Sequence, residues 1–209
     1  MADPKESIIR LPAANTDRAC EMLSRAFFHD SKMTHLIPES AARRDRSKDL
    51  FAFELRYGMI YGDVYTTSPG VEGVAVWLPS EKSEITLWRA FRAGGLGLQR
   101  HLGKETMDRL MAFSTAIDVL HKKHVHSPHC YLFFIGVDPG YQGKGYAGRL
   151  IRPMLDRLDR KKIPCYLNTQ NEKNISLYEH FGFRVVDQLI LPGSTILHTA
   201  MLRDPFPTT

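Results

Sequence analysis

A glycine-spaced loop between an apolar run and an amphipathic run most constrains how this chain can fold. Residues 131–137, YLFFIGV, are almost all apolar and rich in aromatic and β-branched types, which predicts a buried strand. The Asp-Pro-Gly turn at 138–140 ends that strand, and the glycine loop follows at 142–147. Apolar residues then recur at helical spacing, at Ala147, Leu150, Ile151, Met154, Leu155 and Leu158. The stretch therefore predicts a strand, a loop and a helix in succession.

Such a unit predicts an anion-binding site. The first N–H groups of a helix have no partner inside the helix, and the helix dipole favours negative charge at that end. Glycine lets backbone N–H groups come close to a ligand because it carries no side chain. We therefore expect this loop to bind a phosphate group of a cofactor.

Two well-known phosphate motifs do not account for the loop. The P-loop pattern fails because a Gly-Lys pair is followed by Gly145, where a Mg²⁺-binding Ser or Thr is needed. The dinucleotide fingerprint G-x-G-x-x-G is matched in letters by Gly143, Gly145 and Gly148. However, residues 138–142 separate these glycines from the strand, and the next predicted strand, 165–168, ends without an acidic residue.

A third motif fits both in letters and in context. Residues 142–147, QGKGYA, resemble the coenzyme A pyrophosphate loop of the GNAT N-acetyltransferases, and 137–145 has the form V-x-P-x-Y-Q-G-x-G of that family. A second signature follows at 171–183, NEKNISLYEHFGF, which looks like N-x-x-A/N-x-x-x-Y-E-x-x-G-F. The resemblance covers about 128–203. Over 129–183 it looks most like the puromycin-acetyltransferase-like branch.

The resemblance implies an α/β (α+β) GNAT acyl-CoA N-acyltransferase fold, with a mixed central sheet of about six to seven strands flanked by helices. The strand–helix–strand order predicts that 131–137 and 164–169 pair in parallel. Residues 28–40 are expected to form a loop. Helices at 83–93 and 105–124 form an insertion at about 83–124 that either shapes an acceptor site or only covers the sheet. We expect one domain over 1–209.

The resemblance also implies which residues bind acetyl-CoA. Loop amides would take the pyrophosphate, the pantetheine arm would pair with the strand near Gly136, and Asn171 or Asn174 would bond to that arm or only cap a helix. Lys144 either adds charge or faces solvent. The residues expected to bind are Ile135, Gly136, Val137, Gln142, Gly143, Lys144, Gly145, Tyr146, Ala147, Asn171 and Asn174.

Two catalytic roles follow from the same resemblance. The Val137 N–H would stabilise the thioester carbonyl oxygen, and Tyr178 would protonate the departing thiolate, since a phenol of pKa about 10 is protonated at neutral pH. A core aromatic is the alternative for Tyr178. The general base is left open, and ordered water could replace it. The candidates are Glu54, Glu72, Glu84, His129 and Tyr131.

Composition limits the remaining possibilities. The net charge of +5 includes no basic run longer than 160–162, so we expect an anionic cofactor and no nucleic acid. Three dispersed cysteines and the absence of an apolar leader or span predict a cytoplasmic protein without a membrane partner. The histidine-rich tract at 121–129 is better explained by a solvated helix end, so we expect no metal.

The prediction from sequence is an acetyl-CoA-dependent N-acetyltransferase. It would move the acetyl group directly, through a tetrahedral intermediate, to a primary amine of a small molecule, such as an antibiotic or aminonucleoside. The alternatives are a protein N-terminal or lysine acetyltransferase, a non-catalytic acyl-CoA sensor and a dinucleotide-binding protein. The protein could be a monomer or a homodimer, and the sequence leaves the acceptor open.

Overall fold

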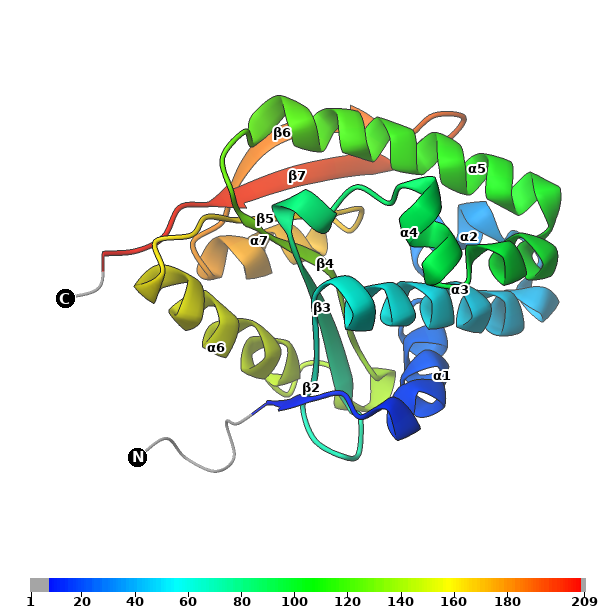
Figure 1. Cartoon of the computed structure of the whole chain (residues 1–209), viewed down its shortest axis with the longest axis horizontal. Coiled ribbons are helices and arrows are strands. Elements are labelled where there is room, and N and C mark those ends of the chain that lie inside the picture. The colour runs from blue at the N-terminus through cyan, green and yellow to red at the C-terminus, as the bar shows by residue number, and fades with distance from the viewer. Residues whose placement is uncertain (1–7, 208–209) are drawn as a thin grey trace.

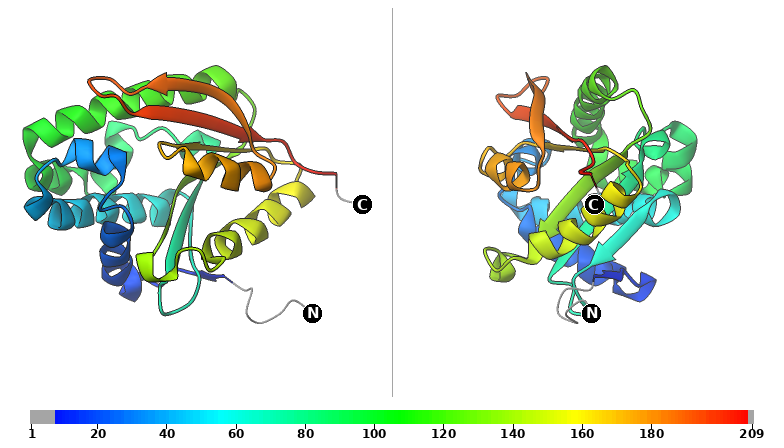
Figure 2. Two further views of the ribbon diagram at one scale, coloured as in Figure 1. Left: turned by 180° about the vertical axis from the view of Figure 1, so that it is seen from behind. Right: turned by 90° about the vertical axis from the view of Figure 1, so that its left-hand side faces the viewer.

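One seven-stranded sheet organises the protein, which we describe from a computed structural model that covers residues 8–207 (Figure 1). The strand order is β1-β2-β3-β4-β5-β7-β6, so β1 and the β6–β7 hairpin lie toward opposite edges (Figure 2). Only β4 and β5 are parallel; the other neighbours are antiparallel. The strands are β1 (Ile9–Arg10), β2 (Asp63–Thr66), β3 (Gly73–Pro79), β4 (Cys130–Val137), β5 (Cys165–Thr169), β6 (Arg184–Ile190) and β7 (Leu197–Arg203). The predicted mixed sheet and its parallel pair are confirmed.

Helices cover both faces of the sheet and give it two hydrophobic cores. One core contains buried side chains of α1, α3 and α5, and the other contains those of α6 and α7. The helices are α1 (Thr16–Ala26), α2 (Ser31–Leu36), α3 (Ser40–Tyr61), α4 (Leu87–Arg92), α5 (Gly95–His124), α6 (Tyr146–Arg160) and α7 (Lys173–His180). No helix within 8–207 is long and apolar enough to cross a membrane.

Two segments differ from the sequence prediction. The expected loop at 28–40 contains α2, because the Asp30 carboxylate caps it by accepting a hydrogen bond of 3.1 Å from the Met33 N–H. In the insertion, the expected helix at 105–124 is present, but an unexpected helical segment precedes it, so that α5 begins at Gly95. Its break lies at Gly103, which has a positive φ of 76° that interrupts the helical conformation.

A β-bulge and an early end of pairing set β4 apart from the other strands. Across from β3, Leu132 pairs with Trp77 and Phe134 pairs with Val76, so Phe133 is the extra residue of a bulge. The bulge places both phenylalanine rings against the core on the α3 face. On its other side, β4 pairs with β5 only over residues 130–132. From Phe133 onward the two parallel strands part.

Gly136 is needed for the packing of α1 against β4. A Cβ atom at this position would lie 2.5 Å from Leu23 Cδ2 and 2.8 Å from Phe27 Cε2, both contributed by α1 and its C-terminal end. The sequence suggested that this glycine serves the approach of a cofactor. The structure adds a second reason, which is the close packing of α1 against the strand, and the cofactor role stays a prediction.

We expect the substitution Gly136→Ala to destabilise the protein by about 1–3 kcal/mol, because the added methyl group overpacks the interface between α1 and β4. Urea unfolding followed by circular dichroism measures this change. The matched control is Gly97→Ala, since a Cβ at Gly97 on α5 meets nothing within 4 Å. That control should stabilise the protein by about 0.5–1 kcal/mol through helix propensity. An equal effect of both substitutions would contradict the packing argument.

Candidate active site

A single groove of about 1940 Å³ passes between the parted ends of β4 and β5. On one face of the sheet it is lined by the glycine loop and by side chains of α6 and α7, including Arg152 and Tyr178. On the other face it continues between α3 and the α4–α5 insertion, where Phe51 and Met111 line it. The gap between two parallel strands thus joins two spaces that the sheet would otherwise separate.

The end of β4 presents backbone groups to this gap. The Asp138 N–H donates to the Glu72 carbonyl oxygen at 2.8 Å. This bond shows which residues at the end of β4 direct their N–H and C=O groups toward the β3 side. Because alternate residues of an antiparallel strand bond to the same neighbour, the N–H and C=O of Val137 point away from β3. Gln142 Nε2 donates to the Val137 carbonyl oxygen at 3.0 Å. The Val137 N–H therefore faces the groove without a strand partner.

The glycine loop leads directly into α6, and two of its glycines border open space. Gly143 and Gly145 have positive φ angles of 74° and 81°, and a Cβ on either would meet nothing within 4 Å. A bond of 2.6 Å between Arg25 and Asp138 ties the start of the loop to α1. Lys144 does not line the groove; its Nζ donates to the Gly140 carbonyl oxygen at 2.8 Å. Its charge stays within the loop itself.

Tyr178 and the two asparagines of the second sequence motif lie along the same groove. The Tyr178 side chain, on the buried side of α7, is 6% exposed, and its ring packs against the ring of Phe183. Burial raises the pKa of Tyr178 to about 12, so its hydroxyl keeps its proton at neutral pH. Asn174 and Asn171 both line the groove, although the Asn171 Oδ1 accepts a bond of 3.1 Å from the Lys173 N–H.

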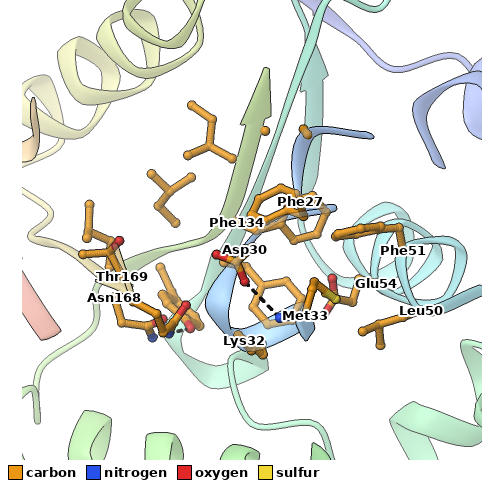
Figure 3. A pocket seen from close by; sticks show the side chains of 18 of the residues that line it. Phe27, Asp30, Lys32, Met33, Leu50, Phe51, Glu54, Phe134, Asn168 and Thr169 are labelled. Carbon is orange, nitrogen blue, oxygen red and sulfur yellow. Dashed lines mark hydrogen bonds between the residues drawn. The ribbon is translucent and has the colours of Figure 1, made fainter. Parts of the chain in front are cut away.

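Beyond the gap, the groove widens into a space that we name the inner chamber. Figure 3 shows it between Asn168 and Thr169 on one side and Glu54 on the other. Its walls combine aromatic, aliphatic and acidic side chains. They are Phe27, Asp30, Lys32, Met33, Leu50, Phe51, Phe53, Glu54, Ile85, Phe91, Met107, Leu110, Met111, Ile117, Asp118, Tyr131, Phe133, Phe134 and Asn168.

The carboxyl groups of the inner chamber are disfavoured as anions. Burial raises the pKa of Glu54 to about 7, although the nearby Lys32 charge opposes that shift. Burial raises the pKa of Asp118 to about 6, aided by the charge of Glu84 and opposed by Lys122. Burial also raises the pKa of Asp30. Asp30 and Asp118 are 88 positions apart, and no sequence pattern indicated that both would line one cavity.

Three of the five candidate bases named from sequence lie away from the groove. Glu72 accepts bonds of 2.8–2.9 Å from Thr67 and Ser68, and these bonds lower its pKa although its burial acts the other way. Glu84 forms an ion pair of 2.9 Å with Lys122 at the surface.

His129 is the third candidate base that lies away from the groove. Its Nε2 lies 2.7 Å from His121 Nε2 in a buried pair, and burial lowers the pKa of both rings. His124 contacts Asp187 at 2.7 Å. Within residues 8–207, no three His, Cys, Asp or Glu side chains gather as a metal site. The expected solvated helix end is thus wrong for His121 and His129, which are buried, whereas His126 is exposed.

The two remaining candidates, Tyr131 and Glu54, face the inner chamber. The Tyr131 hydroxyl accepts a bond of 2.7 Å from Asn168 Nδ2, and burial raises the pKa of Tyr131. The Tyr131 and Glu54 side chains both line this one chamber. Glu54 has no hydrogen-bond partner among the described residues. Of the five candidates, it alone is a free carboxyl group in the groove.

Comparison with known proteins identifies the family. Residues 68–183, more than half of the 209, match the acetyltransferase (GNAT) family, and the chain belongs to this family. An uncharacterized N-acetyltransferase of Schizosaccharomyces pombe is 28% identical over 205 residues, which cover 94% of this chain and 82% of that protein. The family predicted from sequence is confirmed, and the puromycin-like branch stays a prediction.

Solved structures agree on the fold. A Corynebacterium glutamicum protein, described as histone acetyltransferase HPA2 and related acetyltransferase, superposes with a TM-score of 0.69 at 19% identity over 97% of this chain and 98% of its own. The ribosomal-protein-S18-alanine N-acetyltransferase of Escherichia coli gives a TM-score of 0.53 at 17% identity, with coverage of 97% and 96%. The fold is thus that of the GNAT acetyltransferases.

The buried Glu54 carboxyl group predicts a pH-dependent gain in stability from Glu54→Gln. The pKa of Glu54 rises from 4.5 in the unfolded chain to about 7 in the folded one. Between these pH values the unfolded chain loses the proton and the folded chain keeps it, so the stability of the native state falls as the pH rises. The neutral glutamine removes this loss. We expect the variant's advantage in unfolding free energy to be about 2 kcal/mol larger at pH 8 than at pH 5.

Urea titrations at both pH values measure the difference. The matched control is Asp45→Asn, on the same helix, whose carboxylate is 79% exposed. Its effect should be the same at both pH values. A Glu54→Gln effect that does not depend on pH would mean that the carboxyl group is well solvated.

Proposed function

We propose that this protein transfers the acetyl group of acetyl-CoA to a primary amine of a small molecule. The observation that carries the proposal is the groove through the parted β4–β5 pair, on which the Val137 N–H and Tyr178 both lie. The open side of the glycine loop and the N-terminus of the 15-residue helix α6 suit a pyrophosphate. The unpaired edge of β4 suits the amide groups of a pantetheine arm.

Each protein group has a defined task in this proposal. Acetyl-CoA supplies the acyl thioester. The β4 edge at 135–137 would hold the pantetheine arm extended, and Asn171 and Asn174 would bond to it. The Val137 N–H would donate to the thioester carbonyl oxygen as negative charge develops there. Tyr178, protonated at neutral pH, would donate its proton to the departing thiolate sulfur.

The walls of the inner chamber support a small acceptor over a protein. Helices α4 and α5 lie across the acceptor end of the groove, where a polypeptide substrate would need an open cleft. A protein N-terminus or lysine side chain is the second candidate acceptor. We further propose that the chain works as one domain, as a monomer or homodimer, in the cytoplasm; its three free cysteines suit a reducing compartment.

The substitution Tyr178→Phe tests the reaction and its acid together. We expect kcat for thiol release from acetyl-CoA to fall about 100-fold, with KM for acetyl-CoA unchanged, because only the proton donor is lost. The control Tyr61→Phe removes a hydroxyl on α3 that does not line the groove, and should leave kcat unchanged. A native rate in Tyr178→Phe would assign the proton to another donor.

The loop is tested by Gly145→Ala. The new side chain disfavours the positive φ of 81°, so the amides at the start of α6 lose their arrangement and the Kd for coenzyme A should rise about tenfold. Isothermal titration calorimetry measures this Kd. The control Gly193→Ala brings the same kind of strain at a φ of 68°, in the β6–β7 turn away from the groove. Equal Kd values for both variants would argue against the loop as the binding site.

A further inference from the structure

Glu54 is a buried acid that the fold itself does not explain. Its side chain is only 9% exposed, it projects from α3 into the inner chamber, and no hydrogen bond within residues 8–207 satisfies it (Figure 3). A buried carboxyl group without a partner costs stability. A ligand that brings a positive charge or a proton would supply the missing partner.

The surroundings of Glu54 are mainly aromatic. The bulge in β4 turns both Phe133 and Phe134 toward the α3 face, where the Phe51 ring lies 5.3 Å from Phe27 and 5.9 Å from Phe134. Such rings offer apolar surface and favourable faces for a cation. A hydrophilic amine alone would leave this surface without a partner.

The mouth of the chamber is apolar as well. Helices α4 and α5 place four side chains on the groove that remain strongly exposed, namely Leu87 at 87%, Phe91 at 54%, Leu96 at 67% and Met111 at 54%. Exposed apolar side chains gathered on one cavity mark a binding surface. They continue the aromatic walls outward from Glu54.

The charges in the chamber favour a cation. Asp30 at the start of α2 and Asp118 on α5 join Glu54, while Lys32 on α2 is the cation near Glu54 and Asp30. Lys122 is the cation near Asp118, and His29 and Tyr131 also line this part of the groove. Three acidic groups thus line the chamber with one lysine. An acceptor with its own carboxylate would meet repulsion from most of them.

We propose that the inner chamber takes an amphipathic amine, that Glu54 is the base which accepts a proton from its ammonium group, and that its apolar body lies against the α4–α5 insertion. This inference rests on the proposed function and adds the acceptor class and the base. The acceptor is an alkyl- or arylalkylamine without an acidic group.

The proton balance of the transfer is complete with these groups. Glu54 takes one proton from the ammonium, which frees the nitrogen lone pair. The nitrogen then forms a bond to the thioester carbon, and the carbon–sulfur bond breaks. The sulfur takes the Tyr178 proton, and the second proton shed by the nitrogen restores the phenol. Glu54 finally releases its proton to water, so one proton leaves for each amide formed.

The role of Glu54 is tested with phenethylamine as acceptor and the variant Glu54→Gln. We expect kcat/KM at pH 7 to fall about 100-fold, with the Kd for coenzyme A unchanged, and the rise of activity between pH 6 and 8 to vanish. Asp45→Asn on the same helix is the control and should keep the native rate and profile. A Glu54→Gln enzyme within about threefold of native, with its pH profile intact, would overturn this role.

The apolar body is tested on α5 with Met111→Ser and its control Val119→Ser. Both residues are strongly exposed, at 54% and 65%, but only Met111 lines the groove. With Met111→Ser we expect KM for phenethylamine and hexylamine to rise about tenfold, while KM for ethanolamine stays the same. The control should match the native enzyme with all three. An equal change for ethanolamine and phenethylamine would contradict the apolar contact.

A comparison of acceptors separates this inference from the function on which it rests. Native enzyme should release thiol faster with phenethylamine and hexylamine than with ethanolamine, putrescine, phenylalanine or a tripeptide. Faster release with ethanolamine, putrescine or phenylalanine would overturn the acceptor class and leave small-molecule acetyl transfer standing. Release with the tripeptide alone, or none despite coenzyme A binding, would overturn the proposed function and the inference with it.

Discussion

The parting of β4 from β5 is the constraint on which the rest of the site depends. Two parallel strands would ordinarily pair along their whole length, yet here they pair only over residues 130–132 of β4. The bulge at Phe133 bends β4 at that point. The same divergence opens the groove, frees the backbone edge near Val137 and joins the glycine loop on one face to the inner chamber on the other. Because the strands that part are central in the sheet, both hydrophobic cores border the opening.

Two buried acidic side chains, Asp159 and Glu54, differ in their hydrogen-bond partners. Asp159 on α6 receives two bonds of 2.7 Å from the Arg203 guanidinium, and Arg203 Nε also donates to the Phe181 carbonyl oxygen at 2.9 Å. This pairing lowers the pKa of Asp159 against the opposing effect of burial and ties β7 to α6. Glu54 is buried to a similar degree and receives no such bond. A structural acid is thus satisfied within the chain, whereas the acid in the groove has no hydrogen-bond partner among residues 8–207.

Local sequence was enough to predict the loop, its flanking strand and helix, and the parallel pair, because turn residues and apolar spacing act over a few positions. The family could be predicted for the same reason, since both motifs are contiguous. The short helix α2 could not, because its only local signal is the cap from Asp30. The inner chamber could not be predicted from the sequence either. It joins Asp30, Glu54 and Asp118 from three helices, and only tertiary packing brings their side chains together.

The bulge makes the length of β4 as important as its composition. Phe133 is an extra residue opposite β3, so a chain with one residue fewer between Leu132 and Ile135 could pair in unbroken register with β3. A straight β4 would then continue beside β5, and the opening between them would close by ordinary sheet formation. Homologous chains can therefore exchange residue types along this strand, whereas a gap in it removes the passage. In alignments of related chains, the count of residues from Cys130 to Asp138 is the quantity to compare first.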